Sequence, residues 1–259
     1  MNPKTAQLAE VFSSIQGEGI YVGERQFFVR FAGCNLSCQY CDSPQALEIK
    51  PNYRFEAVPG AHKWESRGNP VTTPQLVELL TSLDKPGLDH SLSLTGGEPL
   101  LQVEFLKEFL PTVKAALKLP IYLETNGTLP EHLNEVIDLV DIIAMDIKLP
   151  SLAYRQAGAT GLSPYWKEHK KFLEIAYLKE VFVKIVVAKE TKIMEIDEAA
   201  KLIAAVDEKI PLVLQPVTPH GQIKHRPGAE EILAFQATAK RKLKTVRVIP
   251  QIHKLLGLS

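Results

Sequence analysis

From about residue 90 onward, short β-branched runs alternate with longer amphipathic runs. The runs typical of strands lie at 91–95, 121–124, 141–146, 181–187 and 212–215, and an earlier one lies at 26–31. Helical patterns lie near 74–83, 102–117, 129–138, 163–177, 195–207 and 229–241. Because parallel strands need crossover connections, this alternation predicts an α/β fold with a mostly parallel sheet. Six strands are fewer than the eight of a closed barrel, so we expect an open, partial (β/α)6 barrel of the TIM type, with a doubly wound sheet as the alternative.

Polar or glycine-rich residues stand where five of these predicted strands end. They are the cysteine-containing loop after 26–31 and the segments 95–99, 124–127, 146–148 and 215–218. In β/α folds, ligands bind beyond the carboxyl ends of the parallel strands. We therefore expect the five segments to meet at one mouth of the fold.

The chain has three cysteines, Cys34, Cys38 and Cys41, and all of them lie within eight residues. A cubane iron–sulfur cluster takes one cysteine on each of its four irons, and a structural zinc ion likewise takes four ligands. This C-x3-C-x2-C spacing supplies one thiolate too few, which would leave the fourth iron open to a small molecule. A zinc site that borrows a histidine is the main alternative, and three buried free thiols are the other.

Composition narrows the class of protein further. Thirty basic residues balance thirty acidic ones, which argues against a nucleic-acid partner. An odd, clustered set of cysteines indicates a reducing compartment. The start of the chain does not resemble a signal peptide, and no run approaches the roughly 18 apolar residues of a membrane helix. We expect a cytoplasmic protein without a membrane segment.

Residues 48–70 do not follow the alternation. They carry three prolines, two glycines and three aromatic residues without a clear period, and they are too long for an ordinary connection. We predict that they elaborate the cysteine loop and cover the site.

The cysteine loop resembles that of the radical SAM enzymes, in which three cysteines hold a [4Fe–4S] cluster whose open iron binds S-adenosylmethionine. The Gly-Gly-Glu-Pro sequence at 96–99 resembles a second element of that superfamily. The segments 12–19, 28–36 and 253–259, together with the cysteine loop, are similar to one family within it, the 7-carboxy-7-deazaguanine synthases.

The resemblance implies a carbon–nitrogen lyase that converts 6-carboxy-5,6,7,8-tetrahydropterin into 7-carboxy-7-deazaguanine with loss of ammonia. This reaction belongs to the biosynthesis of queuosine-type 7-deazapurines, a tRNA modification pathway. It also implies a [4Fe–4S] cluster, S-adenosylmethionine and Mg²⁺ as cofactors, and an electron donor such as flavodoxin or ferredoxin. A homodimer is expected.

The resemblance also assigns site residues. Cys34, Cys38 and Cys41 would be the catalytic cluster ligands, and Ser43 would bind magnesium where the family usually has Thr. The cofactor contacts would be Tyr40, Cys41, Asp42, Gly97, Glu98, Glu124, Asp146, Ile147, Lys148, Gln215, Pro216, Val217 and Thr218. The substrate contacts would be Ile15, Gln16, Gly17, Glu18, Arg30, Thr95, His253 and Ser259. Arg30 would pair with the pterin carboxylate through its planar fork of donors, and Glu98 with the ammonium of S-adenosylmethionine.

The end of the chain, 250–259, is unusually apolar for a terminus. We predict that Leu255, Leu256 and Leu258 pack against the protein and that Gly257 permits a bend. The carboxylate of Ser259 would then face the pterin. The tail would thus close the substrate site of a single domain spanning 1–259.

Two other functions compete with this interpretation. A radical SAM activase, which generates a glycyl radical on a partner protein, shares the cluster loop. Gln16, Glu18 and Arg30 favour a small polar substrate instead. A non-catalytic iron–sulfur or zinc scaffold is the second alternative, but it has no use for polar residues at five strand ends.

Overall fold

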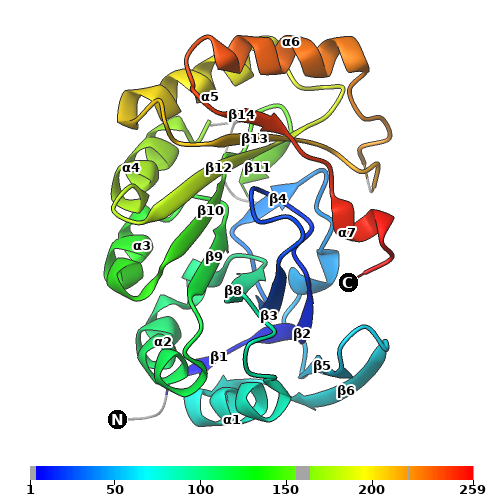
Figure 1. The fold of residues 1–259 in the computed structure, drawn as a ribbon, viewed down its shortest axis with the longest axis vertical. Coiled ribbons are helices and arrows are strands. Elements are labelled where there is room, and N and C mark those ends of the chain that lie inside the picture. The colour runs from blue at the N-terminus through cyan, green and yellow to red at the C-terminus, as the bar shows by residue number, and fades with distance from the viewer. Residues whose placement is uncertain (1–3, 156–163, 221, 259) are drawn as a thin grey trace.

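The computed structural model describes residues 4–155, 164–220 and 222–258 (Figure 1). Its main sheet has ten strands in the order β14-β13-β12-β10-β9-β8-β3-β2-β5-β6. In chain order these strands are β2 (Leu8–Ile15), β3 (Arg25–Phe31), β5 (Asn52–Val58), β6 (Lys63–Gly68), β8 (Ser91–Gly96), β9 (Ile121–Thr125), β10 (Ile142–Asp146), β12 (Glu180–Val187), β13 (Leu212–Pro216) and β14 (Val246–Val248).

The six strands predicted from sequence are β3, β8, β9, β10, β12 and β13, and each pairs in parallel with its neighbour in chain order. A seventh parallel strand, β14, follows β13. The sheet ends at β14 on one side and β6 on the other, so it is open. The α/β fold with an open, mostly parallel sheet is therefore confirmed.

Six helices follow the predicted patterns closely. They are α1 (Thr73–Leu83), α2 (Val103–Leu117), α3 (Pro130–Val136), α4 (Trp166–Ala176), α5 (Ile193–Val206) and α6 (Ala229–Lys240). Helices α1 to α4 run along one side of the sheet in Figure 1. In α2, Phe105, Phe109 and Val113 recur every four residues and are buried, and the first two rings stack with their centroids 5.3 Å apart. Burial of this stripe against the sheet stabilises the helix.

The part of the sheet beyond β3 was not assigned from the sequence. Strand β2 pairs antiparallel with β3 and parallel with β5, and β5 and β6 form an antiparallel hairpin. The hairpin accounts for most of residues 48–70. It therefore extends the main sheet through β2.

Smaller elements fix the loops. Strand β4 (Leu36–Cys38), inside the cysteine loop, pairs with β11 (Ala153–Arg155), and β1 (Thr5–Ala6) pairs with β7 (Val71–Thr72). Short 3₁₀ turns occupy Pro44–Ala46, Pro99–Gln102 and Ile137–Leu139, and the short helix α7 (Ile252–Leu255) lies near the C-terminal end. Among the described helices, none is both long enough and apolar enough to cross a membrane.

Candidate active site

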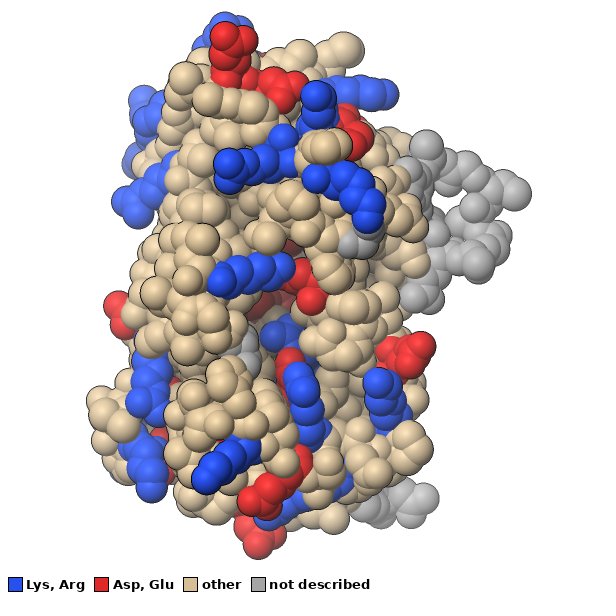
Figure 2. All heavy atoms as spheres, turned by 90° about the vertical axis from the view of Figure 1, so that its right-hand side faces the viewer, with Lys and Arg blue, Asp and Glu red and all other residues tan. Residues whose placement is uncertain are grey.

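A cavity of about 410 Å³ opens at the carboxyl ends of the parallel strands. All five polar segments expected at strand ends contribute residues to its lining, so their convergence is confirmed. Figure 2 shows the face with this hollow, where acidic and basic side chains lie around the opening and inside it. Of the site residues predicted from sequence, all line the cavity except Glu98, Ile147, Pro216 and Ser259.

Glu98 lies behind the cavity wall and is fully buried. Its carboxylate accepts hydrogen bonds from the backbone N–H groups of Leu100 (3.1 Å) and Asn126 (2.8 Å) and from the Thr125 hydroxyl (2.9 Å). Burial raises the pKa of Glu98 to about 6, against the lowering effect of these donors. Its side chain therefore braces the turn after β8 against the turn after β9, and the predicted contact with an ammonium group stays a prediction.

Ile147, Pro216 and Ser259 are the other predicted site residues that are not part of the cavity lining. Ile147 is fully buried and belongs to the main apolar core. Pro216 is half-buried at the end of β13, between the cavity-lining Gln215 and Val217. Ser259 lies outside the described residues, so its predicted contact stays a prediction.

The glycine pair at the end of β8, Gly96 and Gly97, lies directly against the cysteine loop. The Gly97 N–H donates to the Phe31 carbonyl (3.0 Å), and the Glu98 N–H donates to the Gly33 carbonyl (2.8 Å). A Cβ atom on Gly97 would lie 1.9 Å from the Gly33 carbonyl oxygen. Only glycine therefore permits the two loops to approach this closely.

The three cysteines are half-buried free thiols that line the cavity. Within the described part of the chain, their sulfur atoms do not all lie within 4.8 Å of one another. Since a Zn–S bond is about 2.3 Å long, two sulfurs on one zinc ion can be at most about 4.6 Å apart. The three thiols as placed do not surround one metal ion, and three thiolates from one short loop suit a cluster in which each sulfur binds a different iron.

Without a bound metal, these thiols are protonated at neutral pH. Burial raises the pKa of Cys34 to about 11 and also raises the pKa of Cys38 and of Cys41. Protonated thiols do not ligate metals, so a bound cationic iron must displace the three protons. The chain has no fourth cysteine. The residues present therefore fit a [4Fe–4S] cluster with one iron open.

The ends of β10 and β12 add a buried charge cluster beside the cysteine loop. The Lys148 ammonium lies 2.8 Å from the Asp146 carboxylate and 5.2 Å from the centroid of the Tyr40 ring, and Lys184 lies 3.4 Å from Asp146. Burial lowers the pKa of Lys148, but the charge and hydrogen bond of Asp146 together with Tyr40 and Cys38 outweigh it, so that pKa lies well above its usual value. Burial likewise lowers the pKa of Lys184, but Glu18 and Asp146 outweigh it, so that pKa is also raised. Both lysines are therefore positively charged.

Two hydrogen-bond acceptor atoms near the carboxyl ends of β10 and β13 are buried without a hydrogen-bond partner among the described residues. They are Oδ1 of Asp146 and Oε1 of Gln215, both on cavity-lining side chains. Buried polar atoms are normally paired. Unpaired acceptors here fit a bound ligand that carries N–H or O–H donors, as the adenosine of S-adenosylmethionine does.

Glu124, at the end of β9, is oriented by two neighbours. The Gln16 amide donates to one carboxylate oxygen (2.7 Å), and the Thr95 hydroxyl donates to the other (2.7 Å). The Gln16 amide also donates to Gln26 (2.9 Å), and its oxygen accepts from the Glu18 N–H (3.0 Å). The loop after β2 is thus connected to the ends of β8 and β9 by side chains predicted for the site.

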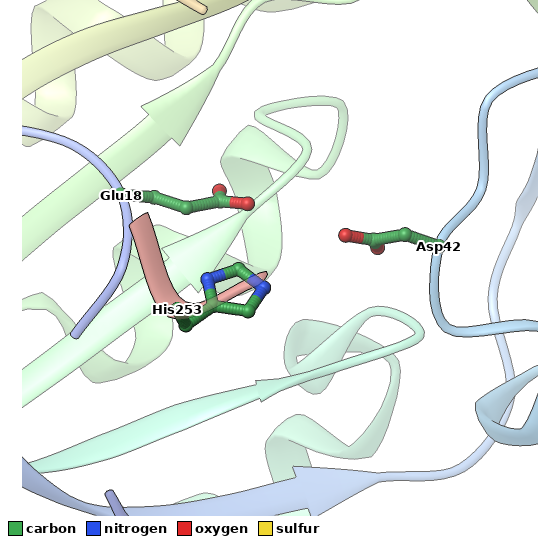
Figure 3. Close-up of side chains that lie close together, drawn as sticks. All are labelled: Glu18, Asp42 and His253. Carbon is green, nitrogen blue, oxygen red and sulfur yellow. The ribbon is translucent and has the colours of Figure 1, made fainter. Parts of the chain in front are cut away.

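Glu18, Asp42 and His253 come together from three distant segments (Figure 3). One ligand atom from each lies within 4.8 Å of the others. In Figure 3 the two carboxylates point toward each other, and the imidazole lies close to both. The Gln251 amide connects them, because it donates to Glu18 and to Asp42 at 2.6 Å each.

Each carboxylate of this cluster already has a lysine ammonium group as its partner. Lys184 forms an ion pair with Glu18, and Lys254 lies 3.4 Å from Asp42. Burial raises the pKa of Glu18, but the charge and hydrogen bond of Lys184 together with the hydrogen bond from Gln251 more than offset it, so the pKa is lowered. Burial lowers the pKa of His253. At neutral pH the cluster therefore offers charged carboxylates and a neutral imidazole, which suits a polar ligand with N–H donors.

Helix α7 brings His253 to this position. The Ile252 N–H donates to the Gly17 carbonyl (2.9 Å), and a Cβ atom on Gly17 would lie 2.0 Å from Nδ1 of His253. Leu258 lines the cavity, and Gly257 adopts a positive φ of 66°, as a bend requires. The predicted packing of Leu255 and Leu256 is wrong, since 76% and 59% of their surfaces are exposed. The backbone contact with Gly17 and the cavity contacts position the tail instead.

Arg30, on β3, lies beside Ser43, two residues after the last cysteine. Its Nε donates to Glu10 (2.7 Å), and its Nη1 donates to the Ser43 hydroxyl (3.1 Å). The Ser43 hydroxyl also lies 3.3 Å from a carboxylate oxygen of Asp42. These hard oxygen donors suit Mg²⁺, whereas the Arg30 charge on the same hydroxyl opposes it. Magnesium at Ser43 stays a prediction.

The sequence did not single out four residues of this site, namely Glu10, Arg54, Lys184 and Gln251. Lys184 carried a signal, because it is a charged residue inside the apolar strand run 181–187. Parallel strands are buried on both faces and are normally apolar throughout. A lone lysine in such a run indicates a buried partner. Glu10, Arg54 and Gln251 had no comparable local signal.

Comparison with known proteins gives the family. The model of the radical SAM superfamily matches residues 28–207. The chain is 44% identical over 261 residues to the 7-carboxy-7-deazaguanine synthase of Geobacter sulfurreducens, with 99% of both chains covered. It is 35% identical over 265 residues to the synthase of Methanothermobacter thermautotrophicus, with 98% of both covered.

A solved structure supports the fold. The crystal structure of QueE from Escherichia coli matches with a TM-score of 0.57 and 18% identity, covering 95% of this chain and 94% of that one. At that identity the likeness concerns the fold alone. The family that the motifs suggested is confirmed by the sequence relatives. The chain belongs to the radical SAM superfamily and, within it, to the 7-carboxy-7-deazaguanine synthase family.

Proposed function

We propose that this protein is a radical SAM lyase that converts 6-carboxy-5,6,7,8-tetrahydropterin into 7-carboxy-7-deazaguanine and ammonia. The observation that carries the proposal is the composition of one cavity. It brings three free cysteines together with Gln16, Glu18 and the Arg30 guanidinium. The first set suits a cluster with an open iron, and the second suits a polar heterocycle that bears a carboxylate.

Cys34, Cys38 and Cys41 would hold the [4Fe–4S] cluster, and the strand ends at Asp146, Lys148 and 215–218 would hold S-adenosylmethionine. When bound, the cluster and S-adenosylmethionine supply the radical that abstracts a hydrogen atom from the substrate. The protein's own residues bind and orient the reacting groups. The cavity wall around Tyr40 and Val217 is apolar and buried, so it excludes water from the reacting atoms.

On the substrate side, Arg30 would bind the carboxylate through charge-assisted hydrogen bonds. The carboxylate of Glu18 would accept hydrogen bonds from the exocyclic amine and the ring N–H groups of the pterin, and so would that of Glu124, in place of the cofactor contact that the sequence predicted for it. Lys184 keeps Glu18 charged, and Gln16 and Thr95 fix the orientation of Glu124. The neutral His253 would add a further polar contact at this end of the cavity.

Four expectations accompany this proposal. Magnesium at Ser43 would neutralise part of the substrate carboxylate charge. A flavodoxin- or ferredoxin-type protein would supply the electron. The active form would be a homodimer, and the location would be cytoplasmic. Metal analysis tests the magnesium, and reduction assays with each donor test the source of the electron. Measurement of the solution mass tests the homodimer.

The experiment is anaerobic turnover. The protein is reconstituted with iron and sulfide and reduced, and S-adenosylmethionine and the carboxy-tetrahydropterin are added. Formation of 7-carboxy-7-deazaguanine with one ammonia per product supports the proposal. Cleavage of S-adenosylmethionine with an unchanged pterin would instead favour another substrate, including a partner protein as in the activases.

A further inference from the structure

A second arginine faces the cavity beside Arg30. It is Arg54, which comes from β5 of the hairpin that extends the sheet. The Glu10 carboxylate joins the two guanidinium groups. One oxygen of Glu10 accepts from Nε of Arg30 (2.7 Å), and the other accepts from Nε (2.8 Å) and Nη2 (2.6 Å) of Arg54.

Glu10 is suited to holding both arginines in fixed positions. It lies on β2, between β3 and β5, and it is only 4% exposed. A buried carboxylate with both oxygens bonded to guanidinium groups is satisfied, and removal of one partner would leave it underpaired. The two-point contact from Arg54 fixes the plane of that guanidinium as well as its position.

Aromatic rings restrict the two arginines from the other side. The Arg54 guanidinium carbon lies 4.2 Å from the centroid of the Trp64 ring, on β6. The corresponding atom of Arg30 lies 5.7 Å from the centroid of Phe12. Cation–π contacts at such distances hold a guanidinium over a ring face. Hairpin residues therefore place Arg54, and β2 places Arg30.

The charges at this end of the cavity do not cancel. Two guanidinium groups face one carboxylate, so the group carries one net positive charge. Each guanidinium has five N–H donors, and the hydrogen bonds described above engage two on each. Donor capacity and positive charge thus remain at the cavity surface, beside the arginine proposed to bind the substrate carboxylate.

We propose that Arg54 is a second carboxylate-binding group of the substrate site and that Glu10 positions it beside Arg30. The inference rests on the proposed function and extends it to the hairpin. Two cationic groups distinguish a pterin that carries a 6-carboxylate from one that lacks it. The β5–β6 hairpin is then a specificity element of the site.

The test compares Arg54→Ala with a control on the same hairpin. Arg67, on β6, is exposed, lies 5.2 Å from the ring centroid of Phe55, and does not line the cavity. Arg67→Ala therefore removes an equal charge and a similar ring contact without touching the site. KM and kcat are measured with the carboxy-tetrahydropterin, together with cluster absorbance, cleavage of S-adenosylmethionine without substrate, and thermal stability.

Arg54→Ala is expected to raise KM about fivefold, a moderate effect because the side chain is partly exposed and screened by salt. Cluster absorbance and substrate-free cleavage are expected to stay at the wild-type level, and Arg67→Ala is expected to keep the wild-type KM. Arg54→Lys, which keeps the charge but not the fork, should fall between them. Raising the ionic strength should increase the wild-type KM more than that of Arg54→Ala.

Three results would overturn the inference. In the first, the wild type forms product, and Arg54→Ala and Arg67→Ala have the same KM for the carboxy-tetrahydropterin. Arg54 then does not bind the substrate, and the proposed function stays intact. In the second, Arg54→Ala loses cluster and thermal stability and Arg54→Lys restores neither KM nor salt dependence, which indicates a structural role. In the third, the wild type forms no product from the pterin, and the proposed function fails together with the inference.

Discussion

The cavity wall has two regions that are built differently. One consists of the cysteine loop and the turns after β8, β9, β10 and β13, and thus belongs to the repeated β/α units. The other consists of the loop after β2, the β5–β6 hairpin and α7, which come from the two ends of the chain and lie outside those units. We call them the strand-end region and the flanking region.

The difference suggests a division of labour. The strand-end region carries the sulfur atoms and the unpaired acceptors of Asp146 and Gln215, which suit the cluster and S-adenosylmethionine. The flanking region carries charged side chains with charged partners. Glu18, in the loop after β2, pairs with Lys184 of β12, and Arg54, on the hairpin, pairs with Glu10 of β2. We therefore expect changes in the strand-end region to abolish all chemistry, and changes in the flanking region to affect the substrate alone.

The largest effect is expected from the cysteines. Replacement of Cys34, Cys38 or Cys41 by Ala should leave an incomplete cluster, because the chain has no other cysteine to take its place. Cleavage of S-adenosylmethionine and product formation should both fall to background. Iron content, the absorbance of the reconstituted protein and 5′-deoxyadenosine are measured. A single variant with a full cluster and full cleavage would contradict the assignment.

A large but selective effect is expected at Arg30. Arg30→Lys keeps the charge and loses the planar fork that binds a carboxylate through two hydrogen bonds. We expect kcat/KM for the pterin to fall about thirtyfold, the size of a lost charge-assisted hydrogen bond. Substrate-free cleavage of S-adenosylmethionine should stay unchanged. An equal loss of both activities would instead indicate a structural or cofactor-binding role for Arg30.

A smaller effect is expected at Gly17. An added Cβ would collide with the His253 ring and push α7 away from the loop after β2. Gly17→Ala should raise KM for the pterin about tenfold, the cost of one weakened polar contact, and spare the cluster. Gly68→Ala is the matched control, because no atom lies within 4 Å of its added Cβ. If both variants behave like the wild type, α7 does not position a substrate group.

The last effect concerns stability behind the strand-end region and leaves activity at neutral pH unchanged. His169, on α4, is fully buried with its Nε2 3.1 Å from the Asn126 carbonyl oxygen. Burial lowers its pKa from 6.5 to about 4. Between these pH values the unfolded chain binds a proton that the folded protein does not, so the unfolding free energy should fall as the pH drops.

The expected loss is about 3 kcal/mol between pH 6.5 and pH 4. His169→Gln should flatten this part of the pH profile, as measured by denaturant unfolding at several pH values. An unchanged slope in the variant would show that other groups cause the acid sensitivity.

Much of the strand-end region could be predicted from the sequence, because its signals are local. A β-branched run followed by a polar turn is visible within ten residues. Six such runs gave the parallel sheet, and the polar turns after five of them gave its mouth. The prediction that Glu98 faces a ligand depended on a motif. The structure shows that its three hydrogen bonds stabilise two turns, which a motif cannot reveal.

The flanking region was harder to predict because its contacts are distant in the chain. Glu10 and Arg54 are 44 positions apart, Glu18 and Lys184 are 166 apart, and Glu18 and Gln251 are 233 apart. The hairpin also lacked a clear alternation of polar and apolar residues. Such pairs depend on how β2 inserts between β3 and β5, which no local pattern records.

The most direct test of the division between the two regions is to measure 7-carboxy-7-deazaguanine and 5′-deoxyadenosine in the same anaerobic reaction, for the wild type and Glu18→Gln. This variant changes the flanking region and leaves the cysteine loop and strand ends intact. We predict that the wild type forms product, while Glu18→Gln forms 5′-deoxyadenosine at the substrate-free rate of the wild type and little product. If Glu18→Gln loses both products in proportion, or keeps both, the two regions do not act separately and the account is contradicted.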